Sequence, residues 1–358
     1  MTDPFGAAGD EEMPSITPAL EPNEAQRQFD ERLGRLAGDN GRLDLREIRV
    51  TRYKPGRRCV IEYDLIVERP DAPPEEVTLI GKVRVRRFGK SGYRILKAFW
   101  EAGFEAEAPD GICVPEPAGT ISKFRMWLQR KVPGRTATDL IAGPDGEALA
   151  RRVAEAAHKV HRAGVPTERR HTMADELRIL QARLPEVVRQ ESRWERRIGR
   201  VLEACDRLGA RTPEPEPHGI HRDFYADQVI VEGNRIHLID FDLYCEGDPA
   251  LDIGNFLGHL TEQSLRTFGD PRALAHVEAA LEERFVELSG ESARPAVRAY
   301  ADLTLARHVH LSTLFPDRRA FTGDLLELCE ERLEVACKGE GRETVRARRG
   351  HWSGRKEI

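Results

Sequence analysis

Carboxylate and amide side chains with a regular spacing gather in one short stretch, residues 218–252, of the 358-residue chain. It begins with His221-Arg222-Asp223, reaches Gln228 after four intervening residues, and continues to Asp240-Phe241-Asp242. Phosphoryl transfer requires a carboxylate that accepts or orients the attacking hydroxyl, and oxygen ligands that hold Mg²⁺ against the nucleotide phosphates. A lone aspartate could equally be a turn former, but the joint spacing favours a phosphoryl-transfer site.

A tight hairpin is expected to hold these groups in place. Val229–Val231 and Ile236–Ile239 read as two short strands joined by the turn Glu232-Gly233-Asn234. Groups at opposite ends of such a hairpin have a fixed relative geometry, which catalysis by positioning requires. After the hairpin come Gly247-Asp248-Pro249 and then Asp252.

This order of motifs resembles that of the aminoglycoside phosphotransferase and choline kinase superfamily, whose members are distant relatives of protein kinases. The superfamily pattern is H-x-D-x-x-x-x-N, a hairpin, I-D-F or I-D-W, and then G-D-P-x-x-D. The matching positions here are His221, Asp223, Gln228, Ile239-Asp240-Phe241 and Gly247-Asp248-Pro249 with Asp252. The resemblance implies an α+β, protein-kinase-like fold of two lobes, a small antiparallel β-sheet N-lobe and a larger, mostly helical C-lobe. It extends over about residues 45–335.

Residue by residue, the resemblance implies roles for the polar groups of the stretch. Asp223 would be the catalytic base, and Asp240 would hold the Mg²⁺ that bridges the nucleotide phosphates. Gln228 takes the place of the second metal ligand, normally Asn, with its carboxamide one methylene further out. Asp242 could add a second metal carboxylate. Asp252 is assigned to structure, as an acceptor of backbone hydrogen bonds from the catalytic loop.

The resemblance also implies an ATP site in the N-lobe. Lys82 fits the third-strand lysine that pairs with nucleotide phosphates, and Ile80, on the same strand face, would lie beneath the adenine. The backbone of the hinge segment, Arg130, Lys131 and Val132, would contact the adenine edge. The helix after Lys82 has no acidic residue near its start, so the partner of this lysine stays open.

The usual glycine-rich phosphate loop is absent from the sequence. Only the turn Lys54-Pro55-Gly56-Arg57-Arg58 stands at its place. We expect Arg57 or Arg58 to supply positive charge where backbone amides are missing.

Hydrophobic periodicity predicts the elements that position these residues. Strands are expected at Glu47–Tyr53, Val60–Val67, Val77–Val85, around Val114 and at Arg125–Lys131, and a helix at Tyr93–Ala102 that ends at Gly103. Residues 25–132 would form the N-lobe and residues 133–337 the C-lobe. A highly charged segment, 171–209, reads as helices broken near Pro185. The acidic residues 1–24 and the basic residues 338–358 are expected to be disordered tails.

Composition excludes several classes of protein. A net charge of -5 argues against an obligate nucleic-acid binder. The start has neither the basic nor the apolar part of a secretory signal, and no run of eighteen apolar residues predicts a membrane span. The six cysteines form no C-x-x-C pair. We therefore expect a cytoplasmic protein, without a membrane or nucleic-acid partner and of open oligomeric state.

Three functions remain in competition. The first is an ATP- and Mg²⁺-dependent kinase that acts on a small-molecule hydroxyl. The second, a protein kinase, is disfavoured because only eleven residues separate Asp240 from Asp252, with Tyr244 the only hydroxyl among them. The third is a catalytically silent pseudokinase with a regulatory or scaffold role, which Gln228 and the missing glycine loop favour.

The acceptor is left open by the sequence. Acidic residues near the metal site, Glu246 and Asp248, could attract a cationic acceptor such as an aminoglycoside or an amino alcohol. A sugar or another neutral metabolite is equally compatible.

Overall fold

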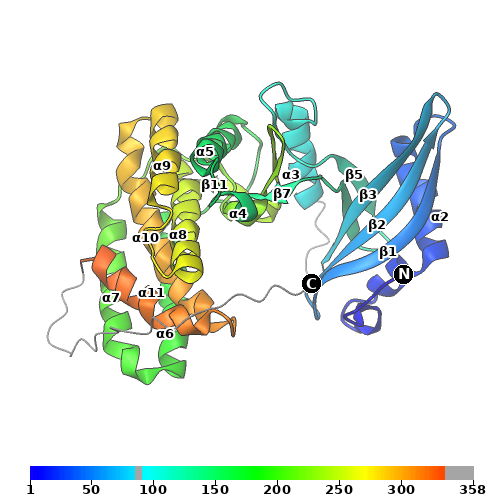
Figure 1. Ribbon diagram of the computed structural model, residues 1–358. Helices are drawn as coiled ribbons and strands as arrows, with labels where there is room; N and C mark the ends of the chain where they lie inside the picture. Colours follow the sequence, from blue (N-terminus) through cyan, green and yellow to red (C-terminus); the bar gives the residue numbers. More distant parts are fainter. Residues whose placement is uncertain (85–90, 335–358) are drawn as a thin grey trace.

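The protein folds into the two lobes that the sequence predicts. The computed structural model describes residues 1–84 and 91–334. A five-stranded sheet lies at one end and a bundle of helices at the other, with helix α3 (Ser91–Phe99) between them (Figure 1). The predicted α+β, protein-kinase-like class is therefore confirmed.

The N-lobe is an antiparallel sheet in the order β1-β2-β3-β6-β5. Its strands are β1 (Arg42–Lys54), β2 (Arg58–Arg69), β3 (Ala72–Arg84), β5 (Pro117–Ile121) and β6 (Met126–Arg130). On β3 the side chains of Val77, Leu79 and Val83 are buried, whereas Ile80 and Lys82 on the other face are half-buried. This alternation is the predicted one, and Val85 of the predicted strand lies outside the described residues.

The first twenty-four residues are ordered against this sheet, so the expectation of a disordered tail is wrong. A 3₁₀ turn (Ala7–Gly9) and the short helix α1 (Ile16–Leu20) precede helix α2 (Pro22–Leu33). Their apolar side chains join the core of the N-lobe, namely those of Ala7, Met13, Ile16, Ala19, Leu20, Phe29 and Leu33. Sparse apolar residues among prolines and acids lower the average hydropathy, yet each finds a place on the sheet. The predicted basic tail, residues 338–358, lies outside the described residues.

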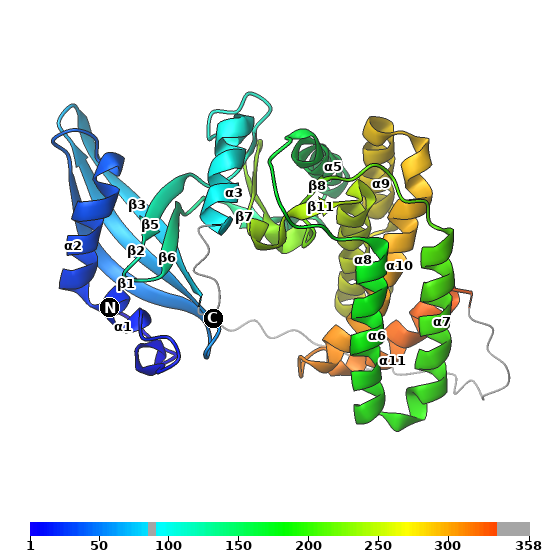
Figure 2. The same ribbon diagram turned by 180° about the vertical axis from the view of Figure 1, so that it is seen from behind.

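Helix α3 connects the sheet to the C-lobe (Figure 2). It passes into a π-helical turn (Trp100–Phe104), in which Gly103 has a φ of 91° that favours glycine at the predicted helix end. The ring of Phe99 lies 4.4 Å from that of Phe241 and 5.0 Å from that of Tyr244, centroid to centroid. Helix α3 thus packs directly on the segment that carries Asp240 and Asp242.

The C-lobe is mostly helical, with short strands that carry the polar motifs. Its helices are α4 (Ala137–Leu140), α5 (Gly146–Arg162), α6 (Met173–Gln190), α7 (Glu195–Arg211), α8 (Pro249–Phe268), α9 (Ala275–Ser289), α10 (Arg294–Thr313) and α11 (Thr322–Arg332). Its strands are β7 (Arg135–Thr136), β8 (His218–Ile220), β9 (Val229–Glu232), β10 (Arg235–Leu238) and β11 (Cys245–Gly247), and β10 also pairs with β4 (Ile112–Cys113). Strands β9 and β10 form the predicted hairpin. Helices α8 and α10 pack so closely at Gly254 that a Cβ there would lie 2.4 Å from the side chain of Tyr300.

The break in the charged segment lies later than predicted. Helix α6 continues through Pro185, and the chain turns only at Ser192–Trp194 before α7 begins. Pro185 is exposed, so water can satisfy the carbonyl that lacks its usual amide donor. No helix within residues 1–84 and 91–334 is long and apolar enough to span a membrane.

Candidate active site

The loop that carries Asp223 is fixed by one buried carboxylate. Asp252, at the start of α8, has no solvent exposure and accepts hydrogen bonds from the amides of His221 (2.9 Å) and Arg222 (2.7 Å). His161 Nε2 of α5 lies 2.9 Å from the same carboxylate. These bonds hold Arg222 at a φ of 71°, a left-handed conformation that side chains rarely adopt. The structural role expected of Asp252 is therefore confirmed.

The two ends of the hairpin are tied to each other. The His221 ring donates from Nε2 to the carbonyl oxygen of Ile239 at 2.9 Å, and the Ile239 amide donates to the carbonyl of Gln228 at 3.0 Å. Asp223 and Gln228 on one side are thus held next to Asp240 on the other. Asp240 itself has a φ of 64°, a second strained position in this site.

A contact between lobes brings Lys82 to Asp240. The ammonium nitrogen of Lys82 lies 3.1 Å from Oδ1 of Asp240 and 4.9 Å from the ring centroid of Trp127 on β6. Asp240 is therefore the partner of Lys82 that the sequence left open. The only acid of the helical segment after β3, Glu101, pairs instead with Lys97 and is exposed.

A second pair lies beside the first one. Arg84, two residues after Lys82 on β3, pairs with Asp242. The start of α3 closes over this carboxylate, because a Cβ at Gly92 would lie 3.3 Å from Oδ1 of Asp242. Two cations of the sheet thus meet two aspartates of the C-lobe.

Burial and proximity shape the pKa values of the three aspartates. Burial acts to raise the pKa of Asp240, but the Lys82 ammonium and a hydrogen bond with Asp242 outweigh it and bring the pKa well below its usual value. Burial raises the pKa of Asp242, and the negative charge of Asp240 adds to the rise against the opposing effect of Lys82. Burial also raises the pKa of Asp223. Asp240 is consequently the most readily ionised of the three.

The oxygen donors near the hairpin suit Mg²⁺. In the described part of the chain no three His, Cys, Asp or Glu side chains form a metal-binding cluster. Mg²⁺ commonly uses one or two carboxylates, waters and substrate phosphates instead. Asp240, Asp242 and the buried Gln228 offer two carboxylates and one amide oxygen, a donor set that fits this preference.

Rows of cationic side chains cross the same face of the sheet. In the strand register Lys54 pairs with Arg58 and Arg58 with Arg84, while the next row runs from Arg52 through Val60 to Lys82. Directly paired residues point to the same face, so these cations lie on the face of Lys82. Arg57, in contrast, belongs to the turn and is exposed.

The cations nearest the β1–β2 turn repel one another. No acidic side chain of the described residues forms an ion pair with Arg52, Lys54, Arg57 or Arg58. The pKa of Lys54 is lowered, first by the charge of Arg58, then by burial and by Arg57 and Arg52. Such a cluster without counter-ions is a favourable place for a polyanion.

The hinge offers fewer backbone groups than expected. The amide of Arg130 donates to the carbonyl of Glu116, and that of Lys131 to the carbonyl of Thr78, both at 2.8 Å. Strand β6 lies between β3 and β5, so both of its edges are already paired. The amides of Arg130 and Lys131 are therefore engaged within the sheet. In the described chain the Val132 amide has no backbone partner.

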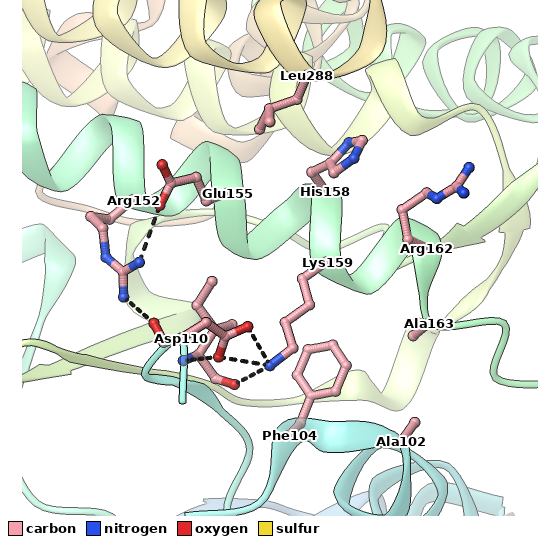
Figure 3. Close-up of a pocket in the computed structure, with 11 residues that line it drawn as sticks. Ala102, Phe104, Asp110, Arg152, Glu155, His158, Lys159, Arg162, Ala163 and Leu288 are labelled. Atoms are coloured by element: carbon pink, nitrogen blue, oxygen red, sulfur yellow. Dashed lines mark hydrogen bonds and ion pairs between the residues drawn. The ribbon is translucent and has the colours of Figure 1, made fainter. Parts of the chain in front are cut away.

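The cavity in Figure 3 lies away from the predicted residues. It has a volume of about 400 Å³ and lies between α5 and the π-helical turn that follows α3. Its Lys159 ammonium contacts the carbonyls of Gly103 (2.7 Å) and Ile112 (2.9 Å) and the carboxylate of Asp110 (2.8 Å). Its nitrogen also lies 4.3 Å from the ring centroid of Phe104. This lysine joins α5 to the segment after α3.

Sequence reasoning missed the residues of the C-lobe helices that support the loop carrying Asp223. Arg307 of α10 donates to Glu176 of α6 at 3.2 Å and also bonds to Asn255 of α8. The Asn255 amide donates in turn to the carbonyl of Phe224 at 2.9 Å, next to Asp223. These residues belong to three separate helices and form no sequence motif, so no local signal identifies them.

The fold and the site together define a protein-kinase-like phosphotransferase architecture. The family model described as "Phosphotransferase enzyme family" matches residues 87–300, which is more than half of the chain. The protein belongs to this phosphotransferase enzyme family, as its motifs led us to expect.

Solved structures with a similar fold cover nearly the whole chain. A choline/ethanolamine kinase family protein from Mesorhizobium loti aligns with a TM-score of 0.51 and 17% identity, over 87% of this chain and 95% of that one. Aminoglycoside phosphotransferase APH(4)-Ia aligns with a TM-score of 0.55 and 16% identity, over 90% of this chain and 98% of that one. A glucosamine kinase aligns with a TM-score of 0.52 and 14% identity, over 84% of this chain and 96% of that one. At such identities the likeness shows the fold. No curated protein matches the sequence.

Proposed function

We propose that the protein transfers the γ-phosphate of ATP to a hydroxyl group of a small molecule, with Mg²⁺ as the metal. The family supports the reaction class. The observation that carries the proposal is the contact between Lys82 and Asp240 across the lobes, beside the loop of Asp223. A phosphate-binding cation, a metal-binding carboxylate and a base are the parts that phosphoryl transfer requires.

Asp223 is the proposed catalytic base. The acceptor oxygen forms a bond to the γ-phosphorus while the bond from that phosphorus to the bridging oxygen breaks, and ADP leaves. The hydroxyl proton passes to the Asp223 carboxylate, whose raised pKa makes it a better proton acceptor. Asp252 keeps this loop in position through its bonds to two adjacent amides.

Asp240, Asp242 and Gln228 are the proposed metal ligands. When bound, Mg²⁺ would neutralise phosphate charge and orient the triphosphate. Asp240 is already ionised, and Gln228 is fixed at the other end of the hairpin through its carbonyl.

Lys82 and the cationic rows are the proposed triphosphate contacts, and Ile80 the floor of the adenine site. Of the two turn arginines, the register favours Arg58 over Arg57, because Arg58 shares the face of Lys82. At the hinge we propose the carbonyls of Arg130 and Lys131 and the amide of Val132. Two similar structures, thermostable mutants of APH(4)-Ia, hold ADP or AMP-PNP together with hygromycin B, which supports nucleotide use.

The acceptor is proposed to be an aminoglycoside-like compound, an amino alcohol or a sugar. The acidic residues give little support to a cationic acceptor. Asp248 caps α8, accepting from the amide of Ala250 at 2.9 Å, and Glu246 is exposed on β11. The side chain of Tyr244 is buried and donates to the carbonyl of Val165, which disfavours control by phosphorylation there.

Nucleotide binding and turnover test the proposal. We expect ATP with Mg²⁺ to raise the Tm by several degrees, since a ligand at 100 times its Kd stabilises the folded state by about 2.7 kcal/mol. Acceptor-dependent ATP consumption should appear on a panel of aminoglycosides, amino alcohols and sugars. Asp223→Asn should lower kcat by at least about a hundredfold and retain nucleotide binding. Asp240→Asn should remove the Mg²⁺ dependence of binding.

Two results would contradict the proposal. Absence of Mg²⁺-dependent ATP binding by the wild type would refute the nucleotide site. Unchanged turnover in Asp223→Asn would refute the assigned base. Tight binding of nucleotide without turnover on the whole panel would favour a catalytically silent protein.

A further inference from the structure

The N-terminal segment is bonded directly to the turn between β1 and β2. Oδ2 of Asp10 accepts hydrogen bonds from the Gly56 amide at 2.8 Å and from the Tyr53 hydroxyl at 2.7 Å. These two bonds lower the pKa of Asp10, and the bond to Asp10 raises the pKa of Tyr53 to about 12. An ionised carboxylate from a distant segment therefore holds both the end of β1 and the turn itself.

Other contacts fix the same segment to the sheet. The backbone of Thr2 pairs with β1: its amide donates to the carbonyl of Ile48 at 2.8 Å, and its carbonyl accepts from the amide of Val50 at 2.9 Å. The Glu12 carboxylate fills the space beside Gly56, where a Cβ would lie 1.9 Å from its oxygen. With Ala7 and Met13 buried in the core, the segment is anchored on both sides of Asp10.

This arrangement changes how the turn can meet a triphosphate. In a glycine-rich loop, backbone amides contact the phosphates. Here the Gly56 amide is occupied by Asp10, and the Arg57 amide donates to the carbonyl of Lys54 at 3.0 Å. Neither amide is available to an anion, so the cations on the Lys82 face must supply the attraction.

We propose that Asp10, supported by the contacts of Thr2 and Glu12, is a positioning element of the nucleotide site that holds the β1–β2 turn so that Lys54 and Arg58 face the phosphates. The inference rests on the proposed function, because it requires the triphosphate to lie on the Lys82 face of the sheet. Asp10 is a positioning residue in this arrangement and touches no phosphate itself.

The experiment compares Asp10→Ala with Glu11→Ala in the full chain. Glu11 is an exposed neighbour without a hydrogen bond or ion pair among the described residues, so it controls for charge and position. Calorimetry measures the Kd of ATP with Mg²⁺ and, separately, of adenosine. We expect Asp10→Ala to weaken ATP binding about tenfold and to leave adenosine binding unchanged, and Glu11→Ala to change neither. Tyr53→Phe, which removes one of the two bonds, should weaken ATP binding about threefold.

The outcomes separate this inference from the proposed function. Wild-type ATP affinity in both Asp10→Ala and Tyr53→Phe overturns the positioning role. Equal loss of ATP and adenosine binding overturns it as well, because a general loosening of the lobe is then the cause. If the wild type binds adenosine but gains no affinity from the phosphates, the proposed triphosphate site itself is wrong. Should Asp10→Ala fail to fold, Tyr53→Phe alone decides.

Discussion

At the residue scale, a buried acceptor decides the shape of the loop that carries Asp223. Asp252 accepts hydrogen bonds from two consecutive backbone amides and lies within hydrogen-bond distance of the His161 ring. As a result, the loop residue Arg222 adopts a left-handed conformation. The sequence could predict this role because Asp252 stands at a fixed spacing in the motif. It could not predict His161, which comes from another helix ninety-one residues earlier.

Replacement of Asp252 should destabilise the protein strongly. Asp252→Ala leaves the amides of His221 and Arg222 without acceptors, and we expect a loss of roughly 3 kcal/mol in the free energy of unfolding. Urea denaturation measures this loss. Glu246→Ala, an exposed acid on β11, is the control and should stay within about 0.5 kcal/mol. A loss in Asp252→Ala no larger than in the control would contradict the bracing role.

The adjacent arginines of the β1–β2 turn offer a matched comparison. Arg58 lies in the row with Arg84, whereas Arg57 is exposed in the turn. We expect Arg58→Ala to raise the Kd of ATP with Mg²⁺ about tenfold, since a charge-assisted contact contributes about 1.5 kcal/mol or more. Arg57→Ala should change it less than about twofold. Titrations at low and at high salt measure both, and a larger effect from Arg57 would contradict the register argument.

At the element scale, periodicity predicted β1, β2, β3, β6 and the hairpin, but it missed β5, and the strand expected around Val114 is β4, which pairs with β10 of the C-lobe. Strand β3 alternates because one face packs on the core and the other faces the C-lobe, a pattern that residue types alone reveal. The N-terminal segment escaped prediction because its few apolar residues have no period. The helix break predicted near Pro185 is absent for a different reason. The amide donor that proline lacks costs little free energy on an exposed helix face, so α6 continues through it.

Lys159 links helix α5 to the segment after α3, and we expect this contact to contribute to stability. Lys159→Met removes the donor that two carbonyls and Asp110 share, and we expect a loss of about 1–2 kcal/mol in the free energy of unfolding. The exposed Arg162, on the same helix and at the same cavity, supplies the control Arg162→Met. Guanidinium denaturation compares the two. Equal stability of both variants would show that the joint does not depend on this lysine.

At the scale of the whole molecule, charged and aromatic contacts bring the lobes together beside the candidate site. Among them are Lys82 with Asp240, Arg84 with Asp242, and the ring of Phe99 with that of Phe241. The family resemblance predicted that Lys82 and Asp240 converge. The pairing of Arg84 with Asp242 had no such precedent in the motif, because it depends on the twist and register of a strand 158 residues away.

Under the proposed function, the two cation–carboxylate pairs between the lobes bear on how a magnesium nucleotide would bind. A magnesium nucleotide brings both signs of charge, phosphate for the cations and metal for the carboxylates. Each side chain can therefore exchange its present partner for one carried by the ligand. The exchange would leave each of these charged groups paired both before and after the ligand binds, which avoids the cost of an unpaired buried charge.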